Sequence, residues 1–283
     1  MSNLPFYQEQ LEFMIEFARH RIEWLNPFFL FLNYFDTPYF YFLLVPVIWF
    51  CISYQWGLRI FYWTTVNHLL MIAAKNSFGW PRPSTEVPEI GLLHPDSYGF
   101  PSAGAQGAML LGSLLIYYWR VPAAWAIGIP YILLISFSRL YLGVHFPLDI
   151  LGGWIFAFLL LVLIIFTKEL IERFLTKKGF PFCLLISLAI PLAILMLFPG
   201  TAYVMGGAMG IGLGSYLSLR YKLFLPPPST FTEGVLRSVI GIAMLFFLVL
   251  LLPQKGWYLS FIPALFMSLA ASPICKWISI KGS

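Results

Sequence analysis

The sequence predicts an all-α integral membrane protein, a polytopic bundle of transmembrane helices. Of its 283 residues, 60% are hydrophobic and only 10% are charged, and the mean hydropathy is +0.82. A soluble domain carries roughly 25% charged residues. The aromatic content of 19% suits belts at the membrane–water interfaces. Because lipid cannot hydrogen-bond a bare backbone, every spanning segment is expected to be helical.

The first 28 residues predict an amphipathic helix that lies in the membrane interface rather than crossing it. Glu9, Glu12 and Glu16 recur at spacings of three and four, with apolar residues between them. This pattern gives one polar and one apolar helix face. The same acidic start is unlike the basic start of a cleavable signal peptide, so none is expected.

Long apolar segments, bounded by proline, glycine or charge, follow the amphipathic helix, and we expect eight or nine of them to span the membrane. A charged stretch at 167–178 predicts a linker. It divides a core at 29–167 from a C-terminal transmembrane extension of unknown role at 168–283. The predicted spans are 38–54, 57–74, 103–119, 122–141, 147–167, 180–198, 201–219, 234–253 and 257–275.

Basic residues in the short loops predict the orientation, since cytoplasmic loops are enriched in lysine and arginine. Alternating the ends of the spans puts Arg59, Arg120 and Arg220 on one side, which should be cytoplasmic. The other side should face the periplasm or exterior, and we expect a bacterial inner membrane. The net charge of +5 then reflects these loops, so no nucleic-acid partner is expected.

The three cysteines, Cys51, Cys183 and Cys275, are far apart and lie in or beside apolar segments. We interpret them as small buried hydrophobic side chains, with neither a disulfide framework nor the spacing of a metal site. The sequence leaves the oligomeric state open.

Three polar stretches fall on the predicted outer side. Three cations among them would suit a multiply charged anion, because arginine offers a planar fork to phosphate oxygens and lysine a point charge. Cations at membrane depth are costly unless paired or wet, which favours a functional reason. The stretches are Lys75-NSFGWP-Arg82-Pro83, Pro101-Ser102-Ala103-Gly104 and Ser138-Arg139-LYLGV-His145-FPL-Asp149.

The third stretch pairs a histidine with a carboxylate. Pro147 suits the first turn of the next span, which places Asp149 inside that turn and His145 just before it. The carboxylate could bind one imidazole nitrogen and leave the other free as a nucleophile. The alternative is an interfacial histidine next to a helix-start aspartate with a structural role only.

These stretches resemble the three signature motifs of the type 2 phosphatidic acid phosphatase (PAP2) superfamily, which are membrane lipid phosphatases related in fold to vanadium haloperoxidases. The first motif is lysine, six residues, Arg-Pro. The third is Ser-Arg, five residues, histidine, three residues, aspartate, and both match here without a gap. The resemblance covers about residues 30–167. The sphingosine-phosphate phosphatase-like and bacterial lipid-diphosphatase branches are the most similar.

The resemblance implies hydrolysis of a phosphorylated lipid that enters from among the membrane lipids, with no metal or other cofactor. His145 would attack phosphorus and form a phosphohistidine, and Asp149 would orient it. Ser138 would lie in the same shell. The groups that would hold the phosphoryl oxygens are the side chains of Lys75, Arg82, Arg139 and Ser102 and the backbone N–H groups of Ala103 and Gly104.

The second motif departs from the family pattern. Pro-Ser-Gly-His becomes Pro101-Ser102-Ala103-Gly104, so glycine replaces the histidine that donates a proton to the leaving oxygen. General acid help is worth roughly 10²–10⁴ in rate. Three hypotheses follow. The protein acts on a phosphoanhydride such as a polyprenyl diphosphate, by hydrolysis or phosphotransfer; or His94 supplies the proton; or the protein is a non-catalytic relative that binds phospholipid headgroups.

Three further features have two interpretations each. Small residues at 200–216 favour close helix packing, although broken helices of a transporter could look similar. Asp36 precedes the first span and could cap it or contribute to the site. Gln106 could bind phosphate or Asp149, or serve the structure only.

Overall fold

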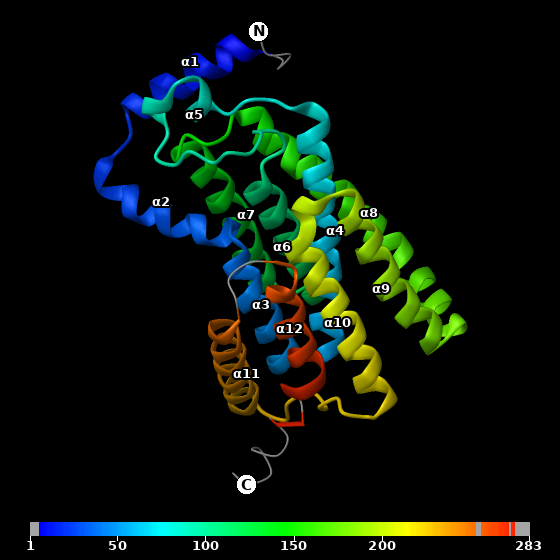
Figure 1. Ribbon diagram of the computed structural model, residues 1–283. Coiled ribbons are helices and arrows are strands. Elements are labelled where there is room, and N and C mark those ends of the chain that lie inside the picture. Colours follow the sequence, from blue (N-terminus) through cyan, green and yellow to red (C-terminus); the bar gives the residue numbers. More distant parts are fainter. Residues whose placement is uncertain (1–5, 253–255, 272, 275–283) are drawn as a thin grey trace. The chain divides into compact units, whose positions relative to one another are not determined.

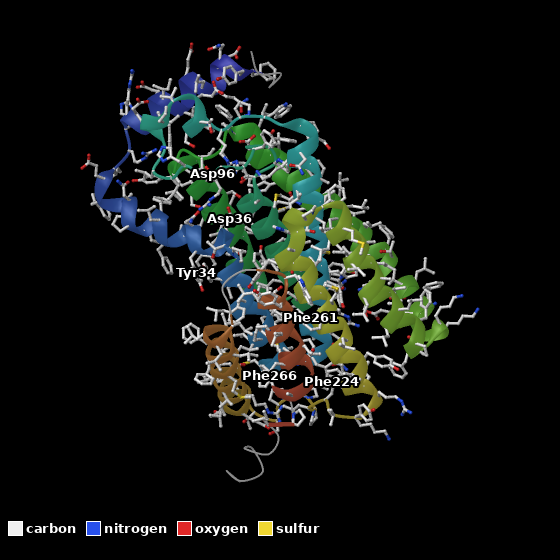
Figure 2. The ribbon with its side chains drawn as sticks, in the orientation of Figure 1. Tyr34, Asp36, Asp96, Phe224, Phe261 and Phe266 are labelled. Atoms are coloured by element: carbon white, nitrogen blue, oxygen red, sulfur yellow. The ribbon has the colours of Figure 1, made fainter. Side chains whose placement is uncertain are left out.

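The computed structural model describes residues 6–252, 256–271 and 273–274 (Figure 1). Within these ranges every regular element is a helix, which confirms the all-α prediction. The chain forms two compact units. Unit 1 comprises Met1–Phe40 and Val66–Phe166, and unit 2 comprises Tyr41–Thr65 and Thr167–Ser283. Cys275, predicted to be buried, lies outside the described residues. Figure 2 adds the side chains.

Unit 1 carries all three polar stretches. Ser102 caps the start of α6, because its Oγ accepts the Ala105 N–H at 3.5 Å. Gly112 and Gly128 let α6 and α7 approach closely, since a Cβ on either would lie 2.9 Å from the other's carbonyl oxygen. The elements are α1 Tyr7–Arg19, η1 Glu23–Leu25, α2 Asn26–Leu32, η2 Asn33–Asp36, the second part of α4 Tyr54–Phe78, α5 Pro83–Glu86, η3 Pro88–Ile90, α6 Ala103–Trp119, α7 Pro122–Tyr141 and the first part of α8 Pro147–Lys178.

The N-terminal helix α1 is part of unit 1 and packs on it. Met14 is fully buried in a cluster with Ile90 and Phe146. The Gln10 side chain accepts the Leu148 N–H at 3.0 Å and so satisfies a donor in the first turn of α8. The predicted amphipathic helix is therefore present, but it ends at Arg19. Its place in a membrane interface stays a prediction.

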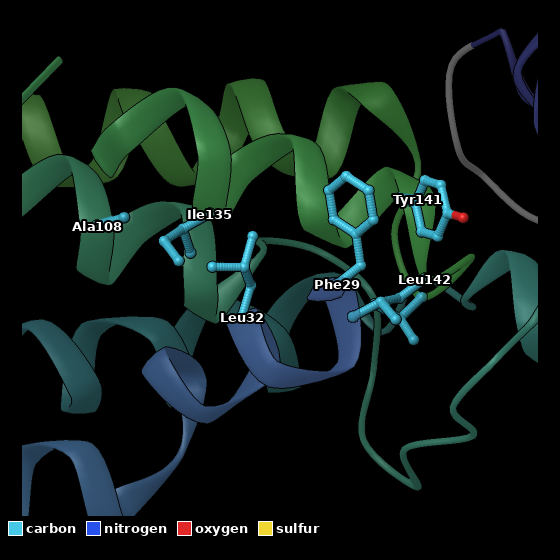
Figure 3. Packing of buried hydrophobic residues seen from close by; sticks show 7 residues of the cluster. Phe29, Leu32, Ala108, Ile135, Tyr141 and Leu142 are labelled. Atoms are coloured by element: carbon cyan, nitrogen blue, oxygen red, sulfur yellow. The ribbon is translucent and has the colours of Figure 1, made fainter. Parts of the chain in front are cut away.

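Helix α2 packs its apolar side chains on α6 and α7 (Figure 3). The Phe29 ring stacks on Tyr141 with centroids 3.9 Å apart, and Leu32 joins the same cluster beside Ala108 and Ile135. The Tyr141 hydroxyl donates to the Ile22 carbonyl at 2.6 Å. This packing brings η2, which follows directly, against α6 and α7.

Unit 2 is built on glycine-mediated helix packing. A Cβ on Gly210 of α10 would meet the Phe261 carbonyl oxygen and come within 3.0 Å of the Ala264 side chain on α12. Gly206 and Gly214 face the same partner helix or its continuation. The predicted packing role of the small residues is therefore confirmed. The elements are α3 Pro38–Cys51, the first part of α4, the rest of α8, α9 Phe180–Leu197, η4 Pro199–Thr201, α10 Ala202–Arg220, α11 Phe231–Leu251, α12 Tyr258–Phe266 and η5 Met267–Ala271.

Helices occupy each predicted span within the described residues. By length and composition, however, fewer of these helices could cross a membrane. There are four, α7, α8, α9 and α11, and a fifth if Glu23–Asp36 and Pro38–Cys51, bent by 63°, form one span. Helix α4 carries polar residues such as Asn67 and Lys75, α6 has 17 residues, and α10 is rich in glycine.

The predicted linker at 167–178 is helical, because α8 continues to Lys178, and the boundary between units 1 and 2 falls at its start. Glutamate, lysine and arginine are good helix formers and pair at helical spacing, as Arg173 does with Glu169 at 3.3 Å. The helix ends where Gly179 adopts φ +79°.

Candidate active site

His145 and Asp149 meet in the turn between α7 and α8. His145 is 2% exposed and Asp149 is fully buried. Asp149 Oδ2 lies 3.2 Å from His145 Nδ1 and also accepts the Phe146 N–H at 2.9 Å. A carboxylate only accepts, so it assigns the imidazole proton to Nδ1. The lone pair of Nε2 therefore faces away from Asp149, as a nucleophile requires.

Arg82 accompanies the free nitrogen of His145. Its Nη1 lies 3.0 Å from His145 Nε2 and donates to the Val144 carbonyl at 2.9 Å. The rest of the guanidinium binds Ser97, with Nε donating to the carbonyl at 2.6 Å and Nη2 to Oγ at 2.9 Å. Arg82 thus ties the segment after α4 and the loop before α6 to the histidine.

Lys75 lies in the last turn of α4 and is buried. Its Nζ donates to the carbonyls of Tyr98 and Gly99, the latter at 3.1 Å. Gly99 sits close to the carboxylate, because a Cβ there would lie 3.0 Å from Asp149 Oδ2. Glycine at 99 therefore allows the loop to bring a lysine and an aspartate to the same place.

The turn at 101–104 is the N-terminus of α6. A cis peptide bond joins Phe100 to Pro101, and Ser102 N–H donates to the Asp149 carbonyl at 2.9 Å. The N–H groups of Ala103 and Gly104 belong to the first turn, where a helix offers donors to an anion. Gln106 instead faces α4, since its Nε2 donates to Asn67 Oδ1 at 3.0 Å, which favours its structural interpretation.

Arg139, near the end of α7, is 2% exposed, and its guanidinium binds side chains on two sides. Nε and Nη2 both donate to Ser138 Oγ at 3.1 Å. Nη1 is shared between Asn33 Oδ1 at 2.7 Å and Asp36 Oδ2 at 3.1 Å. The predicted phosphate-binding arginine is thus held by η2 on one side and Ser138 on the other.

His94 lies apart from this cluster. Its side chain is exposed, and Nε2 sits 3.0 Å from the Pro88 carbonyl oxygen. That contact directs the ring to η3, which packs on α1 and α5. His94 remains a candidate acid only through a movement of its loop.

The charges around His145 favour a neutral imidazole. Burial, together with the positive charges of Arg82, Lys75 and Arg139, holds the pKa of His145 well below its usual range. A neutral imidazole is the form that can attack phosphorus. The cations that would bind a phosphoryl group therefore also keep the nucleophile unprotonated.

Ser97 and Asn33 contact the site but were not predicted from the sequence. Neither belongs to a polar stretch with recognisable spacing, and each reaches an arginine through the tertiary structure. The sequence predicts Asp36 as a cap or a contributor to the site, and the structure brings it to Arg139.

Comparisons with known proteins identify similar sequences. The family model described as PAP2 superfamily matches residues 56–173. Sphingosine-1-phosphate phosphatase 1 of Rattus norvegicus is 27% identical over 213 residues, which cover 65% of this chain and 49% of that protein. Undecaprenyl-diphosphatase of Sulfolobus acidocaldarius is 36% identical over 76 residues, 26% of this chain and 36% of that protein. The chain spans about half the length of the first sphingosine-1-phosphate phosphatases that it matches.

Solved structures show the same fold. Aquifex aeolicus LpxE has a TM-score of 0.51 and 26% identity, covering 58% of this chain and 98% of that protein. A transmembrane PAP2-type phosphatidylglycerolphosphate phosphatase from Bacillus subtilis has a TM-score of 0.50 and 23% identity, covering 61% of this chain and 91% of that protein. Over residues 56–173, the chain is therefore similar to proteins of the PAP2 superfamily.

Proposed function

We propose that this protein is an integral-membrane lipid phosphatase that hydrolyses a phosphorylated lipid through a phosphohistidine. One observation carries the proposal. His145 Nδ1 is engaged by Asp149 at 3.2 Å, while Nε2 lies 3.0 Å from the guanidinium of Arg82. A nucleophile oriented by a carboxylate and set beside a phosphate-binding cation is the arrangement that phosphoryl transfer needs.

The other residues of the cluster have matching roles in the proposal. Lys75, Arg82 and Arg139 neutralise the phosphoryl oxygens as charge develops on them. Ser102 and the N–H groups of Ala103 and Gly104 bind the same group at the helix N-terminus. Ser138 holds the Arg139 fork in place through two 3.1 Å contacts.

The substrate class follows from the relatives only as a proposal. Their names specify a sphingosine-1-phosphate phosphatase, an undecaprenyl-diphosphatase and a phosphatidylglycerophosphatase. They share a phosphoryl group on a long lipid but differ in the group that leaves. A lipid phosphate monoester leaves from a diphosphate as a weak base, whereas an alkoxide leaves from a monoester only with a proton.

The test is phosphate release by purified protein in detergent from sphingosine 1-phosphate, phosphatidylglycerophosphate and undecaprenyl diphosphate. Substrate with a labelled terminal phosphate, quenched in base, should leave acid-labile label on wild-type protein and none on His145→Ala. Phosphate release that requires His145 but leaves no label on the protein would contradict the covalent mechanism.

A second candidate is a relative that binds phospholipid headgroups, or that passes the phosphoryl group to another lipid. The glycine at position 104 favours it, because the second motif lacks its histidine. Label on His145 with no phosphate release would support phosphotransfer. Headgroup binding with no label on His145 would support a binding role.

We also propose that the site faces away from the basic loops, on the periplasmic side of a bacterial inner membrane. A single cysteine at exposed Glu89, in a background without the native cysteines, should react with an impermeant thiol reagent added to whole cells. A cysteine at Arg220 should react only after lysis. The reverse pattern would invert the orientation.

A further inference from the structure

We propose that Asp36 donates the proton to the leaving oxygen in this active site. The inference rests on the proposed phosphatase function and deepens it, because it makes lipid monophosphates accessible substrates. It assigns the missing acid to η2, a turn outside the three polar stretches.

The chemistry requires such a group near the arginines. Breaking the bond between phosphorus and an alkyl oxygen leaves an alkoxide, which is a poor leaving group unless it is protonated as the bond breaks. Among the described residues, the carboxylates whose charge acts on Lys75 and Arg82 are Asp149 and Asp36. Asp149 is engaged by His145 Nδ1 and the Phe146 N–H. Asp36 is therefore the carboxyl group that remains.

Asp36 is placed to reach a bound phosphoryl group. Its Oδ2 lies 3.1 Å from Arg139 Nη1, which also binds Asn33. The Asp36 side chain is 20% exposed while Arg139 is 2% exposed, so Asp36 is the less buried member of the pair. Figure 2 labels Asp36 at the end of η2. A phosphoryl group that binds Arg139 would be next to this carboxyl group.

Gly104 makes room for Asp36. A Cβ on Gly104 would lie 3.0 Å from Asp36 Cγ, 3.0 Å from Asp36 Oδ2 and 3.0 Å from Arg139 Cδ. Any side chain at 104 would therefore have to displace the carboxyl group or the arginine. The start of α6 and the end of η2 can hold one functional side chain between them, and here Asp36 supplies it.

The charged and titratable groups around Asp36 come from two helices and a loop. They are Arg139 and Tyr131 of α7, Lys75 of α4 and Arg82 of the loop that follows α4. A phosphate dianion would compete with Asp36 for these cations. Two negative groups that share Arg139 favour the protonated carboxyl form. Substrate binding would therefore promote protonation of Asp36.

The step balances. The lone pair of His145 Nε2 attacks phosphorus, an N–P bond forms, and the P–O bond to the lipid breaks. The leaving oxygen takes the Asp36 proton and departs as the alcohol. Water then attacks phosphorus and gives a proton to the Asp36 carboxylate. The N–P bond breaks, inorganic phosphate leaves and both side chains return to their starting forms.

The experiment compares two substrates with the same alkyl chain, a monophosphate and a diphosphate. Asp36→Asn should lower kcat for the monophosphate about 10²–10⁴-fold, and about tenfold or less for the diphosphate, whose leaving group needs little help. In the wild-type protein, kcat/KM for the monophosphate should fall at high pH, where Asp36 loses its proton. This fall should be absent in Asp36→Asn. Asp96→Asn, in an exposed loop, is the matched control and should change neither substrate.

Two more variants separate proton donation from support of Arg139. Asn33→Ala removes the other contact to Arg139 Nη1 and should affect both substrates equally, mainly in KM. Asp36→Ala clears the space beside Gly104, so Asp36→Ala with Gly104→His should regain monophosphate turnover over Asp36→Ala alone.

Each outcome decides something. Equal losses on both substrates in Asp36→Asn would overturn the acid role while the phosphatase function stands. If the wild-type protein hydrolysed the diphosphate but not the monophosphate, the acid role of Asp36 would also be overturned. Turnover of neither substrate would overturn the proposed function and, with it, the role of Asp36.

Discussion

Units 1 and 2 bury very different side chains although both are helical. Among the described residues, unit 1 buries five basic or acidic side chains, Lys75, Arg82, Arg139, His145 and Asp149, whereas the buried side chain of this kind in unit 2 is Arg237. Unit 2 instead packs helices on glycines, as at Gly206, Gly210 and Gly214. Ionisable groups are costly in a membrane. Their concentration in unit 1 fits the proposed active site, and the predictions below ask whether unit 2 contributes packing alone.

The largest expected effect is in unit 1, at the carboxylate that orients the histidine. Asp149→Asn keeps the shape but allows an N–H to face His145 Nδ1, which moves the imidazole proton to Nε2 and removes the nucleophilic lone pair. We expect kcat to fall about 10⁴-fold, as for other triads with the wrong tautomer. Phosphate release and phosphohistidine label should fall together.

If Asp149→Asn and wild type had comparable rates, the buried carboxylate would have no catalytic role. The contrast drawn between units 1 and 2 would then fail. Asp96→Asn provides the control for loss of a carboxylate from the same unit.

A smaller loss is expected for Arg139→Lys. Lysine cannot contact Ser138 with two nitrogens while reaching η2 with a third, as the guanidinium does. Losing one hydrogen bond to a charged group, worth about 1.5–3 kcal/mol, predicts a fall in kcat/KM of about 10–10². Arg173→Lys, on the exposed part of α8, is the matched control. Equal activity of the two variants would show that the several hydrogen bonds of the Arg139 guanidinium are not needed for catalysis.

Unit 2 should respond in stability rather than in rate. The Gly210→Ala Cβ would overlap the Phe261 carbonyl oxygen and crowd Ala264 at 3.0 Å, and overpacking costs about 1–3 kcal/mol. We expect a lower Tm in detergent with unchanged kcat per folded molecule. Gly200→Ala meets nothing within 4 Å and is the control. A large drop in kcat at unchanged Tm would show that unit 2 takes part in catalysis.

The smallest effect concerns pH and sharpens the electrostatic side of the comparison. The depressed pKa of His145 means that the imidazole stays neutral as pH falls through about 6.5, where an ordinary histidine takes up a proton. Wild-type kcat/KM should therefore lose its His145-dependent activity only at still lower pH. Lys75→Met removes a positive charge, raises the pKa and should move this loss to higher pH. Comparing both proteins on one substrate cancels the titration of the phosphate itself, and coincident acid limbs would contradict the argument.

Local patterns carried much of this prediction. Hydropathy located the helices because long apolar segments have one stable form in lipid, and the motif spacings named the cations and the histidine–aspartate pair because His145 and Asp149 are four residues apart in one turn. The charge of 167–178 marked the boundary between the units but not the conformation of the stretch, which is helical because those residues have high helix propensity.

The amino-acid sequence was enough to predict the helical membrane architecture, the similarity of residues 56–173 to the PAP2 superfamily and a candidate nucleophile, since each prediction depends on composition or on spacing along one stretch. The side chains next to Gly104, in contrast, depend on tertiary packing. Asp36 reaches Arg139 across 103 residues, because α2 packs Phe29 and Leu32 on α6 and α7 and carries η2 with it. Such a contact depends on which surfaces pack together, and no periodicity in the sequence records it.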